Sequence, residues 1–161
     1  MFNEEELKKV KEKALENHIP ILMDDTLEKI EEILQEEKPK RILEIGTAVG
    51  YSASMFAKST DEDCIIDTIE IDEERAKEAE ENIKKIGVAE RINIMVGNAV
   101  DILPTLTSTY DIVFIDAAKG KYPIFLENAI RLIKDGGIRG IVIEFGDNFN
   151  NFEIDGNIIK A

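Results

Sequence analysis

Residues 41–53 read RILEIGTAVGYSA, and this segment carries the strongest indication of the fold in the sequence. A short apolar run over 41–45 leads into a turn that contains Gly46 and Gly50, and a helix-like segment over 51–58 follows. A buried strand that turns through glycines into a helix is typical of folds in which parallel strands alternate with helices. The stretch therefore predicts an α/β fold if the alternation continues on both sides of it.

The alternation does continue in both directions along the chain. Toward the N-terminus, apolar residues at helical spacing predict two amphipathic helices, one over 4–17 and a second that ends at about residue 35. The N-cap candidates for the second helix are Asp24, Asp25 and Thr26. This pattern predicts a doubly wound, mainly parallel sheet with helices on both faces. Toward the C-terminus the expected strands are 64–71, 92–96, 110–115 and 138–145, and the expected helices are 73–86, 98–103 and 122–134.

Composition limits the classes of protein to which the chain can belong. The 161 residues include 34 acidic and 20 basic side chains, which gives a net charge of −14 and disfavours an extended basic surface for nucleic acid. One cysteine, Cys64, excludes an intrachain disulfide, and with one histidine a zinc site is not expected. The charged N-terminus and the lack of a long apolar run predict a cytoplasmic protein with no membrane partner.

The length is that of a single domain, and no linker or repeat divides it. We expect one domain over 1–161, with N-terminal helices over 1–37, a cofactor-binding core over 38–146 and a short tail over 147–161. In the tail, Asp155-Gly156 lies between two short apolar segments, a pattern typical of a hairpin turn.

Ligands of parallel α/β sheets bind at the carboxyl ends of the strands, so the residues that follow each strand are the candidates for a site. The first strand is followed by a G-x-x-x-G turn, which differs from the G-x-G-x-x-G of dinucleotide-binding proteins. Glu44, two residues before Gly46, would repel a phosphate and suits a ligand that carries an amino group. The alternative is an ordinary turn with incidental glycines.

The next two strands also end in polar side chains. Glu70 stands twenty positions after Gly50, where a carboxylate can accept hydrogen bonds from both hydroxyls of a ribose. Asn98 and Ala99 follow the third strand, where a small residue and an amide can lie against an adenine ring. The alternatives are a solvated acid for Glu70 and a helix N-cap for Asn98.

The fourth and fifth strands end in oxygen-bearing side chains. Asp116 follows the fourth, and Asp147 and Asn148 follow the fifth, which together make an all-oxygen set of the type that Mg²⁺ or Ca²⁺ prefers. Lys119 could deprotonate an acceptor hydroxyl if its surroundings lower its pKa. The alternatives are solvated loop lysines and ordinary turn residues.

Four motifs resemble class I O-methyltransferases that use S-adenosylmethionine (SAM). They are LEIGTAVGYSA at 43–53, TIEID at 68–72, the segment GNAVDILP at 97–104 and FIDAAKGKY at 114–122. More closely they resemble the cation-dependent branch of catechol and caffeoyl-CoA O-methyltransferases, whose bacterial members include tRNA 5-hydroxyuridine methyltransferases. The resemblance covers roughly residues 5–137 and implies a Rossmann-like fold.

The resemblance also implies roles for individual residues. The amino-acid part of SAM would lie against Glu44, Gly46 and Ser52, and Lys119 would be catalytic. Glu70 would hold the ribose, Asn98 and Ala99 would line the adenine, and the segment around Met23 would cover the cofactor. Asp116 would contact both the cofactor and a divalent cation, expected to be Mg²⁺, which Asp147 and Asn148 would also bind.

The implied reaction is methyl transfer to a hydroxyl of a ring acceptor, either 5-hydroxyuridine in tRNA or a catechol-like small molecule. Lys8, Lys9, Lys11 and Lys13 are the local lysines that could contact RNA phosphates, or they form a solvated helix face. The nine residues between Gly137 and Asp147 and the chain end at Ala161 depart from the family pattern. The alternatives are therefore a shortened domain that binds SAM without efficient catalysis and, less favoured by the glycine spacing, a nicotinamide-dependent enzyme. An open sheet edge near the short tail would favour a homodimer.

Overall fold

The fold is a seven-stranded sheet with the strand order β3-β2-β1-β4-β5-β7-β6. A computed structural model describes residues 1–116, 127–128, 131–133, 141–145, 153–155 and 158–160. In this order, each pair of neighbouring strands is parallel except the last pair, β7 and β6, which is antiparallel. The predicted doubly wound parallel sheet is therefore confirmed. The strands are β1 (Arg41–Ile45), β2 (Ile65–Glu70), β3 (Ile92–Val96), β4 (Ile112–Asp116), β5 (Ile141–Phe145), β6 (Glu153–Asp155) and β7 (Ile158–Lys160).

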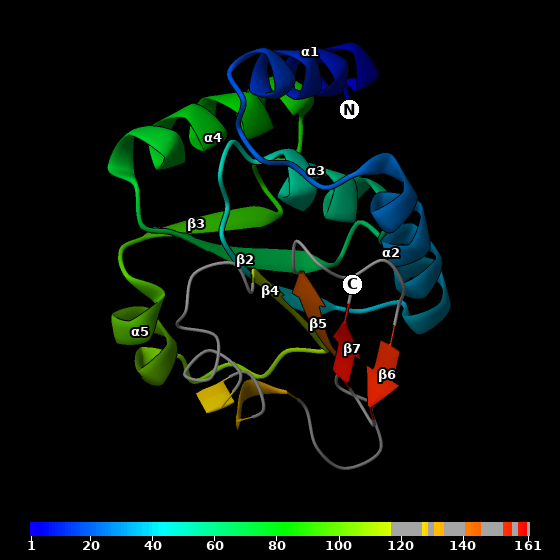
Figure 1. The fold of residues 1–161 in the computed structure, drawn as a ribbon, viewed down its shortest axis with the longest axis vertical. Helices are drawn as coiled ribbons and strands as arrows, with labels where there is room; N and C mark the ends of the chain where they lie inside the picture. The colour runs from blue at the N-terminus through cyan, green and yellow to red at the C-terminus, as the bar shows by residue number, and fades with distance from the viewer. Residues whose placement is uncertain (117–126, 129–130, 134–140, 146–152, 156–157, 161) are drawn as a thin grey trace.

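Helices cover both faces of the sheet, as Figure 1 shows. One face carries α3 (Tyr51–Lys58) and α4 (Glu73–Ile86), with α1 (Glu4–Glu16) packed on these two helices. The short α5 (Ala99–Ile102) and the 3₁₀ turn Leu103–Thr105 lie on the opposite face. The α2 helix (Asp24–Glu37) leads directly into β1.

Two apolar clusters form the core because successive residues of a strand point to opposite faces. Ile42, Ile66 and Phe114 face the first cluster, which is completed by the N-terminal helices, α3 and α4. Leu43 and Val113, one position along their strands, face the second cluster with α5. The Phe56 and Phe114 rings stack with centroids 4.1 Å apart, which joins α3 to β4.

Most predicted elements agree with the structure to within one to three residues at each end. The α4 helix begins after Asp72, whose carboxylate accepts from the Arg75 N–H, and it ends at Gly87 in the left-handed region, both as expected. The predicted N-cap of the second helix is wrong. Met23 occupies that position without a side-chain hydrogen bond, and the Asp24 carboxylate instead forms an ion pair with Lys11 at 2.7 Å.

The C-terminal segments bear on two further predictions. Parts of the predicted helix 122–134 lie outside the described residues, although Glu127, Asn128, Arg131 and Leu132 are helical. The tail pairs as a hairpin would, with Ile154 opposite Ile159, and β7 lies parallel to β5. The edge of β5 is thus paired within the chain. In the described part of the chain, the open edge that was the reason to expect a homodimer is not there, and the homodimer stays a prediction.

Among the described helices, none has the combination of length and apolar character that crossing a lipid bilayer requires.

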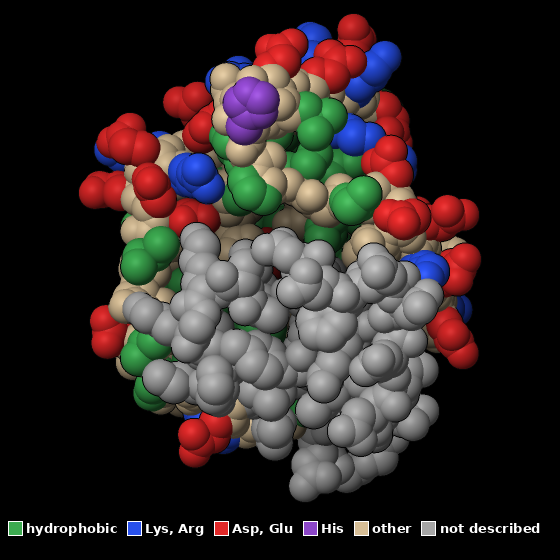
Figure 2. All heavy atoms as spheres, in the orientation of Figure 1, with side chains coloured by type: hydrophobic (Ala, Val, Ile, Leu, Met, Phe, Trp, Pro, Cys, Tyr) green, Lys and Arg blue, Asp and Glu red, His purple; other side chains and the backbone are tan. Residues whose placement is uncertain are grey.

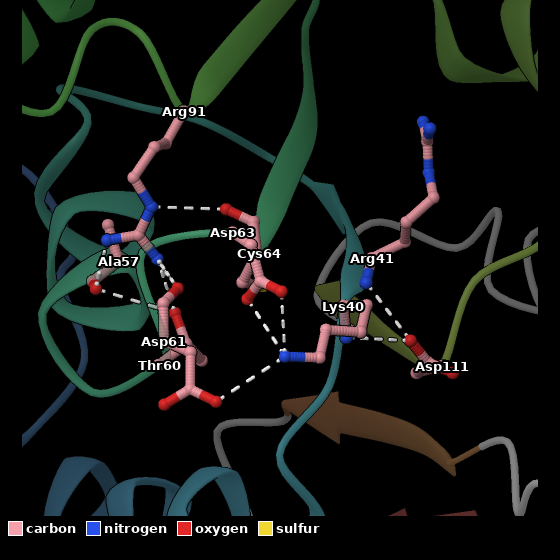
Figure 3. Close-up of polar contacts among 9 residues, drawn as sticks. All are labelled: Lys40, Arg41, Ala57, Thr60, Asp61, Asp63, Cys64, Arg91 and Asp111. Carbon is pink, nitrogen blue, oxygen red and sulfur yellow. Dashed lines mark hydrogen bonds and ion pairs between the residues drawn. The ribbon is translucent and has the colours of Figure 1, made fainter.

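The amino ends of the strands are held by a polar cluster around Arg91, drawn in Figure 3. Its guanidinium donates to the carbonyls of Ala57 at 2.8 Å, Asp61 at 2.7 Å and Cys64 at 3.1 Å, and to the Thr60 hydroxyl at 2.7 Å. These acceptors lie at and beyond the C-terminal end of α3, where carbonyls lack partners within the helix and a cation is favourable. Arg91 therefore fixes the end of α3 against the sheet.

We expect Arg91→Ala to lower the free energy of unfolding by about 2–3 kcal/mol, because it removes four hydrogen bonds from a charged donor, three of them to partly buried acceptors. Urea denaturation followed by circular dichroism measures the change. Lys77→Ala on the exposed face of α4, which removes only surface ion pairs, is the control and should change stability by less than about 0.5 kcal/mol. A loss for Arg91→Ala no larger than that of the control would contradict the assignment.

Candidate functional site

The carboxyl ends of β1, β2 and β3 are joined by backbone hydrogen bonds. The N–H groups of Gly46 and Thr47, just after β1, both donate to the Ile69 carbonyl of β2, at 2.9 and 3.1 Å. The Gly97 N–H, just after β3, donates to the Glu70 carbonyl at 2.9 Å. The segments that follow these three strands therefore form one continuous edge, the part of a doubly wound sheet where ligands bind.

The turn after β1 depends on glycine at position 50. Gly50 has a φ of +84°, and a Cβ there would lie 3.1 Å from Cγ2 of Ile83 and 3.4 Å from Cβ of Ala79. Helix α4 thus approaches the backbone too closely for a side chain. The Asn82 amide donates to the Val49 carbonyl at 2.9 Å and ties the turn to α4.

Glu44 is buried within this edge, with a residue exposure of 3%. One carboxylate oxygen, Oε1, accepts from the Thr68 hydroxyl at 2.7 Å, and the other, Oε2, accepts from the Ser52 hydroxyl. Glu44 and Thr68 are register partners on β1 and β2, which explains their contact. The predicted site residues Glu44 and Ser52 are therefore brought together, and both side chains present polar groups behind the glycine turn.

Glu70 is held by backbone donors from two segments. Its Oε1 accepts from the Ala48 N–H at 2.7 Å and its Oε2 from the Asp72 N–H at 2.9 Å. Ala48 adopts a φ of +48°, which turns its N–H toward the carboxylate at some conformational cost. Glu70 is therefore not the freely solvated acid of the alternative interpretation, since the residue is only 8% exposed.

Two apolar residues beside Glu70 were not predicted from the sequence. Ile71 directly follows Glu70 and is 62% exposed. Val96, the register partner of Glu70 on β3, is 52% exposed. Apolar side chains left exposed next to a held carboxylate offer a flat ring a surface to pack on. The signal in the sequence is that an isoleucine and a valine stand at strand ends, where solvent-exposed residues are usually polar.

Asn98 and Ala99 follow Gly97 at the start of α5. The Asn98 side chain accepts from the Val100 N–H at 3.0 Å, so the N-cap interpretation is confirmed. Its amide nitrogen is a donor that this cap does not use, so a second contact is chemically compatible. Ala99 is 7% exposed and belongs to the second core cluster.

The other predicted site residues are less well connected to this edge. Met23 precedes α2 and is 71% exposed, while its neighbours Ile21 and Leu22 pack on the first core cluster. Asp116 ends β4, next to β1 in the sheet, and its side chain lies outside the described part of the chain. Lys119, Asp147 and Asn148 also lie outside it.

No group of three or more His, Cys, Asp or Glu side chains with the spacing of a metal site occurs among the described residues. The three predicted ligands, Asp116, Asp147 and Asn148, have side chains beyond that part of the structure. The metal site therefore stays a prediction from the sequence.

Charged and hydrophobic side chains occupy different parts of the surface drawn in Figure 2. Acidic side chains, with Lys and Arg among them, lie along the outer rim, and hydrophobic side chains gather beside the grey region. Tyr51, the first residue of α3, is 5% exposed, and burial raises the pKa of its hydroxyl, which therefore stays protonated at neutral pH. The helix that follows the glycine turn thus begins with an uncharged, packed side chain.

Comparison with known proteins identifies what this chain is similar to. Residues 3–148 match the model of the O-methyltransferase family. A catechol O-methyltransferase from Mycobacterium tuberculosis is 38% identical over 100 residues, which are 62% of this chain and 46% of that protein. A caffeoyl-CoA O-methyltransferase from Stellaria longipes is 36% identical over 112 residues, 66% of this chain and 46% of the relative.

A solved structure shows the same fold with a cofactor. The O-methyltransferase TomG from Streptomyces achromogenes, involved in tomaymycin synthesis and solved in complex with SAM, superposes with a TM-score of 0.77 and 32% identity. The match covers 87% of this chain and 64% of that one. The chain spans about half the length of the curated relatives it matches.

Gly50 and Ala48 both have positive φ in the turn after β1, so substitutions at these two positions can be compared directly. Gly50→Ala should lower the free energy of unfolding by about 1–3 kcal/mol, because the added Cβ is strained at positive φ and crowds α4. Ala48→Gly in the same turn removes strain at positive φ and should leave stability within about 1 kcal/mol of the parent. Thermal and urea unfolding measure both variants. Equal destabilisation by the two changes would contradict the description of the turn.

Proposed function

The chain belongs to the O-methyltransferase family, and we propose that it binds SAM and transfers the cofactor's methyl group to a hydroxyl of a ring acceptor. The observation that carries the proposal is the pair of buried carboxylates, Glu44 and Glu70, each held in place at the carboxyl edge of the sheet. SAM offers each of them a suitable partner, an ammonium group for one and a ribose diol for the other.

The described residues fit the parts of SAM in order along the edge. Glu44 would accept from the amino group, with Ser52 and the Gly46 turn beside the amino-acid part. Glu70 would accept from both ribose hydroxyls, and Asn98 with Ala99 would meet the adenine. Ile71 and Val96 add exposed apolar surface for the ring. A pyrophosphate would instead meet the carboxylate of Glu44, so this set of side chains favours SAM over a nicotinamide dinucleotide.

We also propose that catalysis uses a divalent cation, expected to be Mg²⁺, and Lys119. The support is the resemblance of FIDAAKGKY at 114–122 to the cation-dependent branch. Asp116, Asp147 and Asn148 would bind the cation, which supplies Lewis acidity that lowers the pKa of an acceptor hydroxyl. Lys119 would take the proton from that hydroxyl, and the segment around Met23 would cover the cofactor.

For the acceptor, a catechol-like small molecule is favoured over tRNA. All four lysines of α1 that could contact phosphates already have acidic partners: Lys8–Glu12 at 4.0 Å, Lys9–Glu6 at 2.9 Å, Lys11–Asp24 at 2.7 Å and Lys13–Glu78 at 3.3 Å. Paired lysines add little net positive potential, which RNA binding requires. Mass spectrometry after incubation with SAM and either catechol or tRNA distinguishes the two, since methoxyuridine in the tRNA would overturn this choice.

A second candidate is a domain that binds SAM but transfers methyl groups poorly. The fact in its favour is that the chain spans about half of its curated relatives. If the protein is the proposed enzyme, we expect methylated catechol in the presence of Mg²⁺ and much less of this product after chelation with EDTA. SAM binding without product in either condition would favour the second candidate, and lack of SAM binding would contradict both.

Replacing Glu70 tests the cofactor site directly. We expect Glu70→Ala to weaken SAM binding by about 10- to 100-fold, because hydrogen bonds to a charged group are each worth roughly 1.5–3 kcal/mol. Isothermal titration calorimetry measures the affinity. Glu78→Ala in α4, a partly exposed acid that pairs with Lys13 of α1, is the control for loss of one acidic side chain and should keep the parent affinity. An unchanged affinity for Glu70→Ala would contradict the ribose assignment.

Replacing Lys119 tests the catalytic step. Lys119→Ala should lower kcat by about 100-fold or more while SAM affinity stays near that of the parent, because general-base catalysis contributes roughly 10²–10⁴. Steady-state methylation of catechol and calorimetry with SAM measure the two quantities separately. Equal losses of turnover and SAM affinity would assign Lys119 a structural role instead.

A further inference from the structure

A buried chain of hydroxyl groups leads from the glycine turn to Glu44. The Thr47 and Thr68 hydroxyl oxygens lie 2.7 Å apart, and Thr68 Oγ1 lies 2.7 Å from Glu44 Oε1. Thr47 is 1% exposed and Thr68 is fully buried. A hydroxyl in the middle of a buried strand is costly unless it is hydrogen-bonded, so this arrangement needs a reason.

The direction of the hydrogen bonds follows from counting protons. An ionised carboxylate only accepts, and each threonine hydroxyl has one proton to donate. Thr68 gives its proton to Glu44, so the proton between the two threonines must come from Thr47. The Ser52 hydroxyl donates to the other carboxylate oxygen of Glu44.

These donors act together on the geometry of the carboxylate. Thr68 from β2 and Ser52 from α3 each hold one oxygen, which fixes the rotation of the carboxylate group. A carboxylate can accept about four hydrogen bonds, so it can hold both hydroxyls and an ammonium group at once. Thr47 is part of the turn after β1, and its N–H also bonds to the Ile69 carbonyl, so the hydroxyl chain links the turn to both strands.

We propose that Thr68, supported by Thr47, is a positioning residue that orients Glu44 and thereby sets the affinity of the site for the amino-acid end of the cofactor. This inference rests on the proposed function. Thr68 itself lies behind Glu44 and contacts the cofactor only through that carboxylate. Its effect should therefore depend on whether the ligand carries an amino group.

Two ligands and two substitutions test this dependence. S-adenosylhomocysteine carries the amino-acid part, whereas 5′-methylthioadenosine has the adenine, the ribose and a thioether without it. Thr68→Val keeps the shape and removes the hydroxyl, and should weaken S-adenosylhomocysteine binding by about 10- to 100-fold. It should change methylthioadenosine binding by no more than about twofold, and Thr68→Ser, which keeps the hydroxyl, should bind both ligands within about threefold of the parent.

Thr47 should act only through Thr68. Thr47→Val should weaken S-adenosylhomocysteine binding by about 2- to 10-fold, the range for a hydrogen bond between neutral groups. The double variant Thr47→Val/Thr68→Val should bind no more weakly than Thr68→Val, since the first hydroxyl has nothing left to orient. Additive losses would overturn the role of Thr47.

The matched control is Thr60→Val at the opposite end of the sheet, where the hydroxyl bonds to Arg91 (Figure 3). It removes a partly buried threonine hydroxyl and should leave both affinities unchanged. The inference would be overturned if Thr68→Val lost affinity equally for both ligands or lost affinity for neither. It would also be overturned if Thr68→Ser bound S-adenosylhomocysteine as weakly as Thr68→Val. A parent protein that binds neither ligand would contradict the proposed function instead.

Discussion

Two buried carboxylates, Glu44 and Glu70, lie at the ends of neighbouring strands, and the surrounding structure must supply hydrogen-bond donors to both. A buried carboxylate is stable only when donors replace the water it has lost. Glu70 receives two backbone N–H groups, and Glu44 receives two side-chain hydroxyls. The turn after β1 supplies donors to this edge through Ala48 and Thr47, so the shape of the turn and the positions of both acids are determined together.

The rest of the fold keeps that turn in place. On one side α4 packs so closely on Gly50 that no side chain fits, and Asn82 bonds to the turn from the same helix. At the far end of α3, Arg91 anchors carbonyls in the last turn of the helix and just beyond it. The two ends of the sheet therefore differ in character: a cluster of ionic and backbone contacts stabilises the amino ends, and the carboxyl ends present oriented acceptors beside exposed apolar side chains.

Much of this architecture follows from sequence patterns because the patterns are local. Helix α4 could be predicted with its cap at Asp72 and its stop at Gly87, since both signals lie within the helix ends. The start of α2 could not, because the Asp24 carboxylate pairs with Lys11 of another helix. Glu44 and Glu70 could be identified as site candidates from their places at strand ends, and Ser52 from the family resemblance of the motif that contains it. Thr68 was missed because its partner is set by the register of β1 against β2, which no local pattern shows.

If these two carboxylates bind opposite ends of one cofactor, a crystal structure of the protein with S-adenosylhomocysteine will show it. We expect the ligand amino group within hydrogen-bond distance of Glu44 and both ribose hydroxyls on Glu70, with the adenine beside Ile71. A ligand bound elsewhere, or bound with its ribose away from Glu70, would rule out this division of roles.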